Sequence, residues 1–185
     1  ELAEGIRRLA AGLSRRGIRK ADVVAIWAPN LPEFAVVFHA VARLGAVLTT
    51  ANPVYTAEEM TFQLNDSRAV LLVTTTALLD RAREAVAQVT HPIEIISIDA
   101  ADGVPMLEDL AVDAVPPLVA IDPAHDVVVM PYSSGTTGFP KGVMLTHKNL
   151  VANLVQCEGA LTVEDGEVIL AVLPFFHIYG MQVLM

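Results

Sequence analysis

The sequence contains little cysteine and few basic residues, and these shortages exclude several broad classes of protein. It contains a single cysteine, Cys157, so no disulfide can form within the chain, and this usage predicts a cytoplasmic protein. Lysine and arginine together number 12 against 21 acidic residues, and no basic tract occurs. The resulting net charge of −9 disfavours nucleic acid and anionic membranes as partners.

Long hydrophobic runs are also missing. No stretch of about 20 apolar residues is free of charge or proline, and such a stretch is what a membrane-spanning helix needs. The nearest candidate, 34–54, contains Arg43 and Pro53, so we predict a buried helix followed by a strand and no integral membrane span. What the chain does have is 54% hydrophobic residues over 185 positions, which excludes disorder and suffices for a core.

Apolar periodicity predicts a regular alternation of elements. Helices are expected over 2–16, 32–44, 56–65 and 78–89. Strands are expected over 23–27, 46–50, 69–73, 93–98, 127–130, 143–145 and 168–173. Gly17 suits the position after a helix end, and Thr56 with Glu59 forms a capping box. This alternation predicts an α/β fold with a mostly parallel sheet covered by helices.

The chain divides into three consecutive parts. Residues 1–98 form a first α/β part, and 99–125 form a proline-rich connector with a short helical turn near 106–110. Residues 126–185 carry the functional motifs. Within this last part, Thr146 is expected to cap a helix whose apolar positions are Leu150, Leu154 and Val155. Cys157 falls on that helix without a basic neighbour in sequence, so we interpret it as a packing residue rather than a nucleophile.

The most informative stretch follows the predicted strand at 127–130. Over ten residues it gathers four hydroxyls, three glycines and a lysine: Ser133, Ser134, Gly135, Thr136, Thr137, Gly138, Phe139, Pro140, Lys141 and Gly142. Glycines let backbone N–H groups approach an anion, hydroxyls donate to phosphate oxygens and the lysine adds positive charge. We predict a polyphosphate-binding loop beyond the end of a strand, mobile when empty. The alternative, a polar surface turn, needs only one or two glycines.

Two common phosphate-binding motifs do not fit this glycine–hydroxyl loop (133–142). A Walker A motif requires G-x-x-x-x-G-K-[ST], whereas Gly135 and Gly138 are too close together and Gly142 follows Lys141. The dinucleotide fingerprint G-x-G-x-x-G is absent too. A P-loop phosphotransferase is therefore disfavoured. The Ser133–Ser134 pair is similar to amidase loops, but the second lysine and glycine frame of those loops are missing.

A second motif lies at 173–181 and reads LPFFHIYGM. A histidine among aromatics and a glycine suits the wall of a pocket, and the alternative is a buried core histidine at His177. His39 lies on an apolar helix and is interpreted as core packing. The histidines and carboxylates show no metal-ligand spacing, so no metal-binding residue is predicted.

The loop with its flanks, YSSGTTGFPKGVMLTHKNL, closely resembles the phosphate-loop signature of AMP-forming acyl-CoA synthetases. These belong to the adenylate-forming superfamily, which includes 4-coumarate–CoA ligases, fatty acyl-CoA ligases, luciferases and peptide-synthetase adenylation domains. The 173–181 motif resembles the acyl-pocket segment of the CoA ligases more than that of the peptide synthetases.

The resemblance implies roles for individual residues. The phosphates of ATP would contact Ser133, Ser134, Gly135, Thr136, Thr137, Gly138 and Lys141. The acid and its adenylate would contact His177, Tyr179 and Gly180, and the catalytic residues would be Lys141, Thr137 and His177. Lys148 is interpreted as helix surface.

The implied reaction has two steps and three small-molecule partners. A carboxylic acid reacts with ATP, assisted by Mg²⁺, to give an acyl-adenylate, and coenzyme A then takes the acyl group as a thioester. The resemblance also implies that 1–185 is part of a larger N-terminal AMP-binding domain. The remainder of that domain, the adenine and ribose motifs and the C-terminal domain with its lysine would lie outside it, and 1–185 alone would be inactive.

Two alternatives to a CoA ligase stay open at this point. One is a non-catalytic nucleotide- or acyl-binding module, and the other is a different adenylate-forming enzyme of the luciferase or peptide-synthetase type. The sequence leaves the acid open among aryl, medium-chain and long-chain acids.

Overall fold

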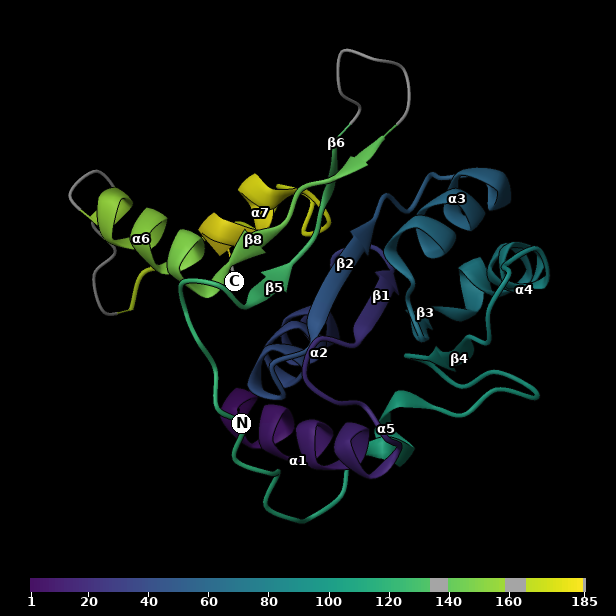
Figure 1. Cartoon of the computed structure of the whole chain (residues 1–185), viewed down its shortest axis with the longest axis horizontal. Helices are drawn as coiled ribbons and strands as arrows, with labels where there is room; N and C mark the ends of the chain where they lie inside the picture. The colour runs from purple at the N-terminus through teal and green to yellow at the C-terminus, as the bar shows by residue number, and fades with distance from the viewer. Residues whose placement is uncertain (134–139, 159–165, 185) are drawn as a thin grey trace.

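The computed structural model describes residues 1–133, 140–158 and 166–184, and in this part of the chain a six-stranded sheet is the central element (Figure 1). Its strand order is β4-β3-β1-β2-β5-β8. The strands are β1 (Val23–Trp27), β2 (Val47–Ala51), β3 (Leu71–Thr74), β4 (Glu94–Ser97), β5 (Val127–Val129) and β8 (Leu145–Thr146). All neighbours pair in parallel except β5 and β8, which are antiparallel.

Helices flank the sheet, and a short hairpin projects from it (Figure 1). The helices are α1 (Leu2–Arg15), α2 (Pro32–Arg43), α3 (Ala57–Ser67), α4 (Leu79–Ala87), α5 (Leu107–Leu110), α6 (His147–Glu158) and α7 (Ile178–Leu184), with a 3₁₀ turn η1 (Thr76–Leu78) before α4. The hairpin pairs β6 (Tyr132–Ser133) with β7 (Lys141–Gly142). The predicted α/β fold with a mostly parallel, helix-covered sheet is therefore confirmed.

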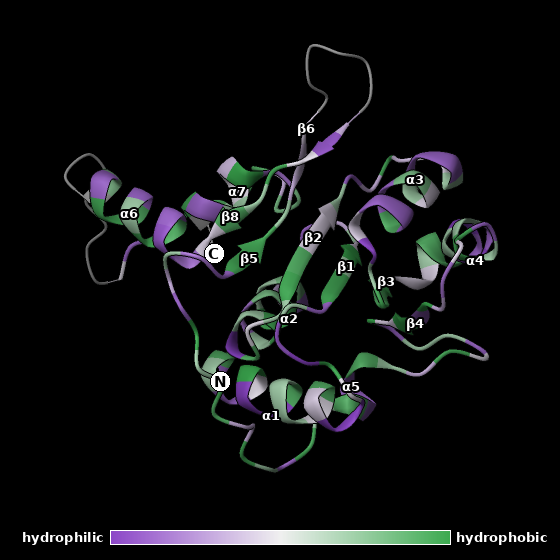
Figure 2. Cartoon of the chain, viewed as in Figure 1, coloured by the Kyte–Doolittle hydropathy of each residue, from purple (hydrophilic) through white to green (hydrophobic). Residues whose placement is uncertain are grey.

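The two faces of the sheet contribute to two separate cores. Along β1, Val24 and Ile26 pack into a cluster with α1 and α2, whereas Ala25 and Trp27 pack into a cluster with α3 and α4. This alternation follows from the period of two in a strand. Because both faces are covered, β1 is apolar along its length, as its green ribbon shows (Figure 2).

The helix ends follow the sequence signals closely. Gly17 has φ = 102° just after α1, a conformation that glycine adopts without strain. The Thr56 side chain accepts from the Glu59 N–H and Glu59 caps Thr56 in return, which completes the predicted capping box. The Thr146 hydroxyl likewise accepts from the Asn149 N–H at 3.2 Å, so Thr146 caps α6 as predicted.

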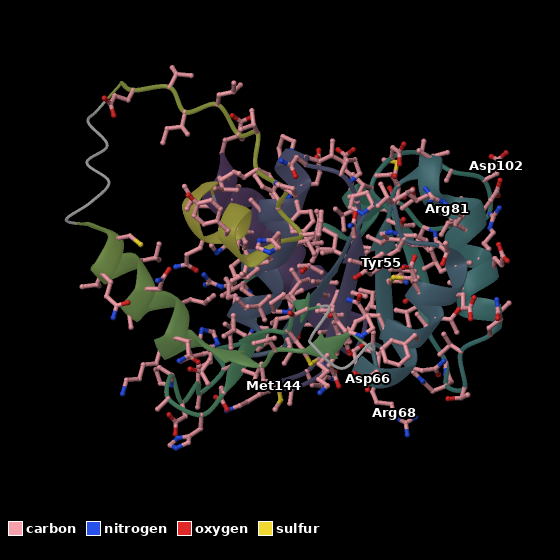
Figure 3. All side chains as sticks on the ribbon, turned by 90° about the horizontal axis from the view of Figure 1, so that it is seen from above. Tyr55, Asp66, Arg68, Arg81, Asp102 and Met144 are labelled. Atoms are coloured by element: carbon pink, nitrogen blue, oxygen red, sulfur yellow. The ribbon has the colours of Figure 1, made fainter. Side chains whose placement is uncertain are left out.

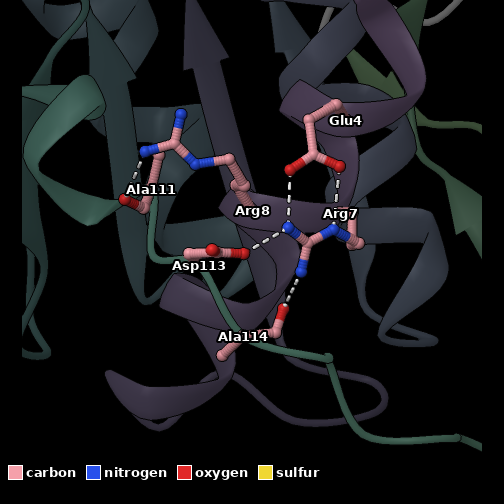
Figure 4. Close-up of polar contacts among 6 residues, drawn as sticks. All are labelled: Glu4, Arg7, Arg8, Ala111, Asp113 and Ala114. Carbon is pink, nitrogen blue, oxygen red and sulfur yellow. Dashed lines mark hydrogen bonds and ion pairs between the residues drawn. The ribbon is translucent and has the colours of Figure 1, made fainter.

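The connector at 99–125 is irregular apart from α5 and runs beside α1. The guanidinium of Arg7 donates to the Asp113 carboxylate and to the Ala114 carbonyl, each at 2.6 Å, and also pairs with Glu4 (Figure 4). Donation from Arg7 lowers the pKa of Asp113 below its usual value. These contacts fix the path of the connector toward β5.

A close backbone approach brings α5 onto α1. A Cβ placed on Gly12 would lie 1.6 Å from the Leu110 carbonyl oxygen. Only glycine leaves room for this crossing, and Leu110 itself is buried in the core beside Leu9 and Leu13.

Two predicted strands differ from the structure. Residues 168–173 form no strand, and Val168, Leu170 and Val172 are exposed, because an apolar run becomes a strand only where a neighbouring strand pairs with it. The predicted strand at 143–145 is instead two short pieces, β7 and β8, on either side of exposed Val143 and Met144.

We expect Gly12→Ala to lower the free energy of unfolding by about 2 kcal/mol or more, because the new methyl group overlaps the Leu110 carbonyl. Gly5→Ala is the matched control on the same helix, since its Cβ would meet the Val36 methyl groups at an ordinary 3.7 Å. Helix propensity predicts that this control stabilises the protein by up to about 1 kcal/mol. Equilibrium unfolding in denaturant measures both, and equal shifts would contradict the steric argument.

Candidate active site

The β6–β7 hairpin brings the two described ends of the glycine–hydroxyl loop together. Ser133 lies directly opposite Lys141 in the pairing, and Tyr132 lies opposite Gly142. The side chains of Ser133 and Lys141 are exposed, so a hydroxyl and an ammonium group face solvent at the same level of the hairpin. The other predicted phosphate contacts and the predicted mobility concern residues outside the described part of the chain: Ser134, Gly135, Thr136, Thr137 and Gly138.

A hydrogen bond joins the base of this hairpin to α3. The Tyr132 hydroxyl donates to the carboxylate of Asp66, whose position is labelled in Figure 3. Burial, followed by this contact with Asp66, raises the pKa of the Tyr132 phenol far above its usual value. The hydroxyl therefore stays protonated and remains a donor near neutral pH. A hollow of about 350 Å³ lies beside this contact, with Phe62 and Pro140 among its walls.

The strand that leads into the hairpin is fixed by a buried relay from α3. The Nε2 group of Gln63 donates to the Thr49 hydroxyl at 2.9 Å, and that hydroxyl donates to the Met130 carbonyl at 2.8 Å. Gln63 and Thr49 are both fully buried. Because hydrogen bonds strengthen one another in a low-dielectric interior, this relay holds Met130, two residues before Tyr132, against β2.

The second motif lies on the other side of β2. The Thr50 hydroxyl donates to the Phe176 carbonyl at 2.6 Å, and Phe175 packs edge-on against Phe34 of α2 at 5.8 Å. His177 is exposed, and its Nδ1 accepts from the Tyr179 N–H at 3.2 Å. His177 is thus not a core histidine. We call residues 173–177 the histidine segment.

Tyr179 and Gly180 have different environments. Tyr179 is exposed and lines an apolar cavity of about 400 Å³ between α6, α7 and β8, together with Leu150 and Cys157. Gly180 is buried, and a Cβ on it would lie 2.2 Å from the Pro174 carbonyl oxygen. Close packing of α7 onto the histidine segment therefore explains this glycine, and its predicted substrate contact stays a prediction.

The environment of α6 differs in part from the sequence-based prediction. Leu150 packs against the core, but Leu154 and Val155 are exposed, so only part of the expected apolar face is covered. Cys157 is half-buried against the cavity between α6 and α7, in keeping with a packing residue. Lys148 is exposed, as expected for helix surface.

The two motifs meet at the carboxyl end of β2. Successive side chains of a strand point to opposite faces, so Thr49 points toward α3 and the hairpin while Thr50 points toward the histidine segment. Four residues that form this site were not predicted from the sequence: Thr49, Thr50, Gln63 and Tyr132. The available signal was a pair of threonines at the end of an otherwise apolar strand.

The described ranges contain no group of three or more His, Cys, Asp or Glu side chains that could hold a metal ion. Within the same ranges, no helix has both the length and the apolar character needed to cross a bilayer. Two carboxylates near the hairpin are already engaged: Asp66 with Tyr132, and Glu59 in its capping box.

Comparison with known proteins gives consistent results. The profile of one family, described as AMP-binding enzyme, matches residues 1–185. The chain is 43% identical over 188 residues to 4-coumarate–CoA ligase 3 of Oryza sativa subsp. japonica, a match that covers 98% of this chain and 33% of that protein. The chain thus spans about a third of the length of the curated relatives it matches.

Solved structures show the same fold. A long-chain-fatty-acid–CoA ligase (FadD1) from Archaeoglobus fulgidus has a TM-score of 0.88 at 31% identity over 98% of this chain and 36% of that one. ATP-bound MatB from Rhodopseudomonas palustris has a TM-score of 0.82 at 30% identity over 99% of this chain and 36% of that one.

We expect Asp66→Ala and Tyr132→Phe each to lower the free energy of unfolding by about 1 kcal/mol, because each removes the same hydrogen bond. The double variant should lose clearly less than the sum, since the two side chains form one interaction. Asp80→Ala is the control, because Asp80 is a fully exposed helical acid with only a 3.9 Å ion pair to Arg83. Additive losses in a double-mutant cycle would show that Tyr132 and Asp66 do not depend on each other.

Proposed function

Because the chain belongs to the family of AMP-binding enzymes, we propose that the intact protein is an AMP-forming acid–CoA ligase. In the proposed reaction a carboxylic acid and ATP give an acyl-adenylate and pyrophosphate. Coenzyme A then takes the acyl group as a thioester and AMP leaves. The relatives named 4-coumarate–CoA ligase support an aryl acid as the first substrate to test, while medium-chain and long-chain acids stay open.

One observation carries this proposal: the hairpin pairs Ser133 with Lys141 in exposed positions at the two ends of the glycine–hydroxyl loop. A phosphate group between them would receive a hydroxyl hydrogen bond and a positive charge at once. We propose that Ser134, Gly135, Thr136, Thr137 and Gly138 complete these contacts. The buried relay from Gln63 through Thr49 holds Met130 in place, so the loop begins from a fixed point.

The first step requires that the carboxylate be positioned against the α-phosphorus and that the charge on the departing pyrophosphate be stabilised. A carboxylate is already ionised near neutral pH, so no general base is needed for its oxygen to attack the α-phosphorus. As the bond to pyrophosphate breaks, negative charge grows on the leaving oxygens. We assign Lys141 and Thr137 to the stabilisation of that charge.

We propose that Mg²⁺ enters with ATP. Magnesium in such sites is bound mainly through substrate phosphates with one or two protein groups, and the exposed Ser133 hydroxyl is compatible with that arrangement. Bound there, the ion would share the charge of the phosphates.

We assign the acid to the side of the site formed by α7. His177 and Tyr179 are exposed there, and Tyr179 lines the apolar cavity between α6 and α7. A cavity with a mainly apolar lining suits the organic part of an acid whose carboxylate must stay near the phosphates. His177, with its Nδ1 already accepting from the Tyr179 N–H, would present its other nitrogen to the carboxylate region.

The remainder of its own chain is the partner we propose for the uncovered apolar surface. Val151, Leu154 and Val155 on α6 and the stretch 168–172 are exposed, and the relatives are about three times as long. Residues 1–98, 99–125 and 126–185 would then be successive parts of one larger N-terminal domain. The cytoplasmic location inferred from the single cysteine stays a prediction.

We expect Lys141→Ala in the intact protein to slow adenylate formation by about 100-fold, because it removes charge stabilisation from the departing pyrophosphate. Thioester formation from a supplied acyl-adenylate should change by less than about threefold. Lys148→Ala removes the same charge from exposed helix surface and should leave both steps unaltered. ATP–pyrophosphate exchange and single-turnover thioester formation measure the two steps, and equal slowing of both would refute the role given to Lys141.

We expect residues 1–185 alone to show no ATP–pyrophosphate exchange above background with a panel of aryl and fatty acids. The adenine, ribose and C-terminal lysine motifs implied by the family resemblance do not occur among these residues. The intact protein, assayed beside it, should turn over at least one acid. Robust ATP–pyrophosphate exchange by residues 1–185 would overturn the inference that essential parts of the site are supplied by the rest of the intact protein. An intact protein that binds ATP without turnover would favour a binding module.

A further inference from the structure

Two polar side chains at neighbouring strand ends hold the histidine segment by its backbone. Thr50 is on β2, and Asn30 follows β1 in the turn that leads to α2. Since β1 and β2 are paired in parallel, these two residues lie at the same edge of the sheet. We propose that Asn30 and Thr50 are positioning residues that fix His177 for binding and activation of the acid; this inference rests on the proposed function.

The contacts of Asn30 are complementary to the segment. Its Nδ2 group donates to the Leu173 carbonyl at 2.8 Å, and its Oδ1 accepts from the Phe175 N–H at 2.8 Å. The same Nδ2 also reaches the Ala171 carbonyl at 3.4 Å. One amide therefore satisfies a donor and an acceptor two residues apart, in the way a neighbouring strand would.

Thr50 adds a third contact at the other end of the segment. Thr50 is only 3% exposed, and its hydroxyl donates to the Phe176 carbonyl at 2.6 Å, next to His177. Phe175 between these contacts is buried against Phe34, so the segment has both apolar and polar attachment to the core. A histidine on an otherwise irregular stretch thereby obtains a fixed backbone.

The consequence for catalysis is specific to the acid. A side chain that must meet a carboxylate gains from being held in place before binding. Loosening the segment should therefore weaken use of the acid while leaving ATP binding at the β6–β7 hairpin largely unchanged, because that hairpin is attached through Thr49 and Tyr132 instead.

Asn30→Ala and Thr50→Val in the intact protein test the proposal. Each should lower kcat/KM for the acid about tenfold, with KM for ATP changed by less than about twofold. Thr50→Ser keeps the hydroxyl and should restore activity. Asn65→Ala and Thr74→Val are matched controls, because Asn65 also bridges a carbonyl and an N–H and Thr74 is also a buried threonine donating to a carbonyl.

A double-mutant cycle separates positioning from general stability. In a His177→Ala background, Thr50→Val should cost less than about twofold, since the group being positioned is gone. Full additivity, or losses matched by the Asn65 and Thr74 controls, would overturn the proposal.

Hydrogen exchange at the Phe175 amide keeps this test independent of turnover. The amide should exchange faster in Asn30→Ala than in wild type, and unchanged exchange would overturn the attachment itself. An inactive wild-type protein would refute the proposed ligase function and with it the role in acid use, while exchange would still decide whether Asn30 holds the segment.

Discussion

The arrangement of the site depends on the burial of β2 between two parallel neighbours. All five residues of β2 are buried, and the strand pairs with β1 on one side and β5 on the other. Polar groups at its carboxyl end must find partners within the protein, since water does not reach them. Thr49 and Thr50 find those partners in the chain just before the hairpin and in the histidine segment. Their hydroxyls thus order two partly buried stretches, 130–131 and the histidine segment, that have little regular structure of their own.

The two cores support different stretches. The cluster with α3 and α4 is on the face of the sheet where Gln63 contacts Thr49, whereas the cluster with α1 and α2 includes Phe175 and Met181. Arg81 of α4 also donates to the Tyr55 carbonyl and lies over the ring of Trp27, so the segment before α3 is held from the same side (Figure 3). The glycine–hydroxyl loop and the histidine segment are therefore each supported by a different core. Because the two cores are on opposite faces of the sheet, the sheet sets the distance between the two motifs.

Local patterns made most elements predictable, and tertiary contacts account for what was missed. The capping residues Thr56 and Thr146 act within a single turn, so their signals lie in adjacent residues. The partner of Asn30 lies more than 140 residues away in the sequence, and no spacing rule links the two. The run at 168–173 has strand-like composition, but pairing depends on a neighbour rather than on the run itself, which is why that prediction was wrong.

The two crowded glycines affect how sequence variation in this family should be interpreted. At positions 12 and 180 a methyl group has nowhere to go, because a backbone carbonyl occupies its place. Purifying selection would keep both sites unvaried across species, one remote from the nucleotide loop and one beside the histidine. If invariance were the only criterion, both glycines would be taken for catalytic or binding residues. Steric exclusion of a side chain explains each of them without any contact to substrate.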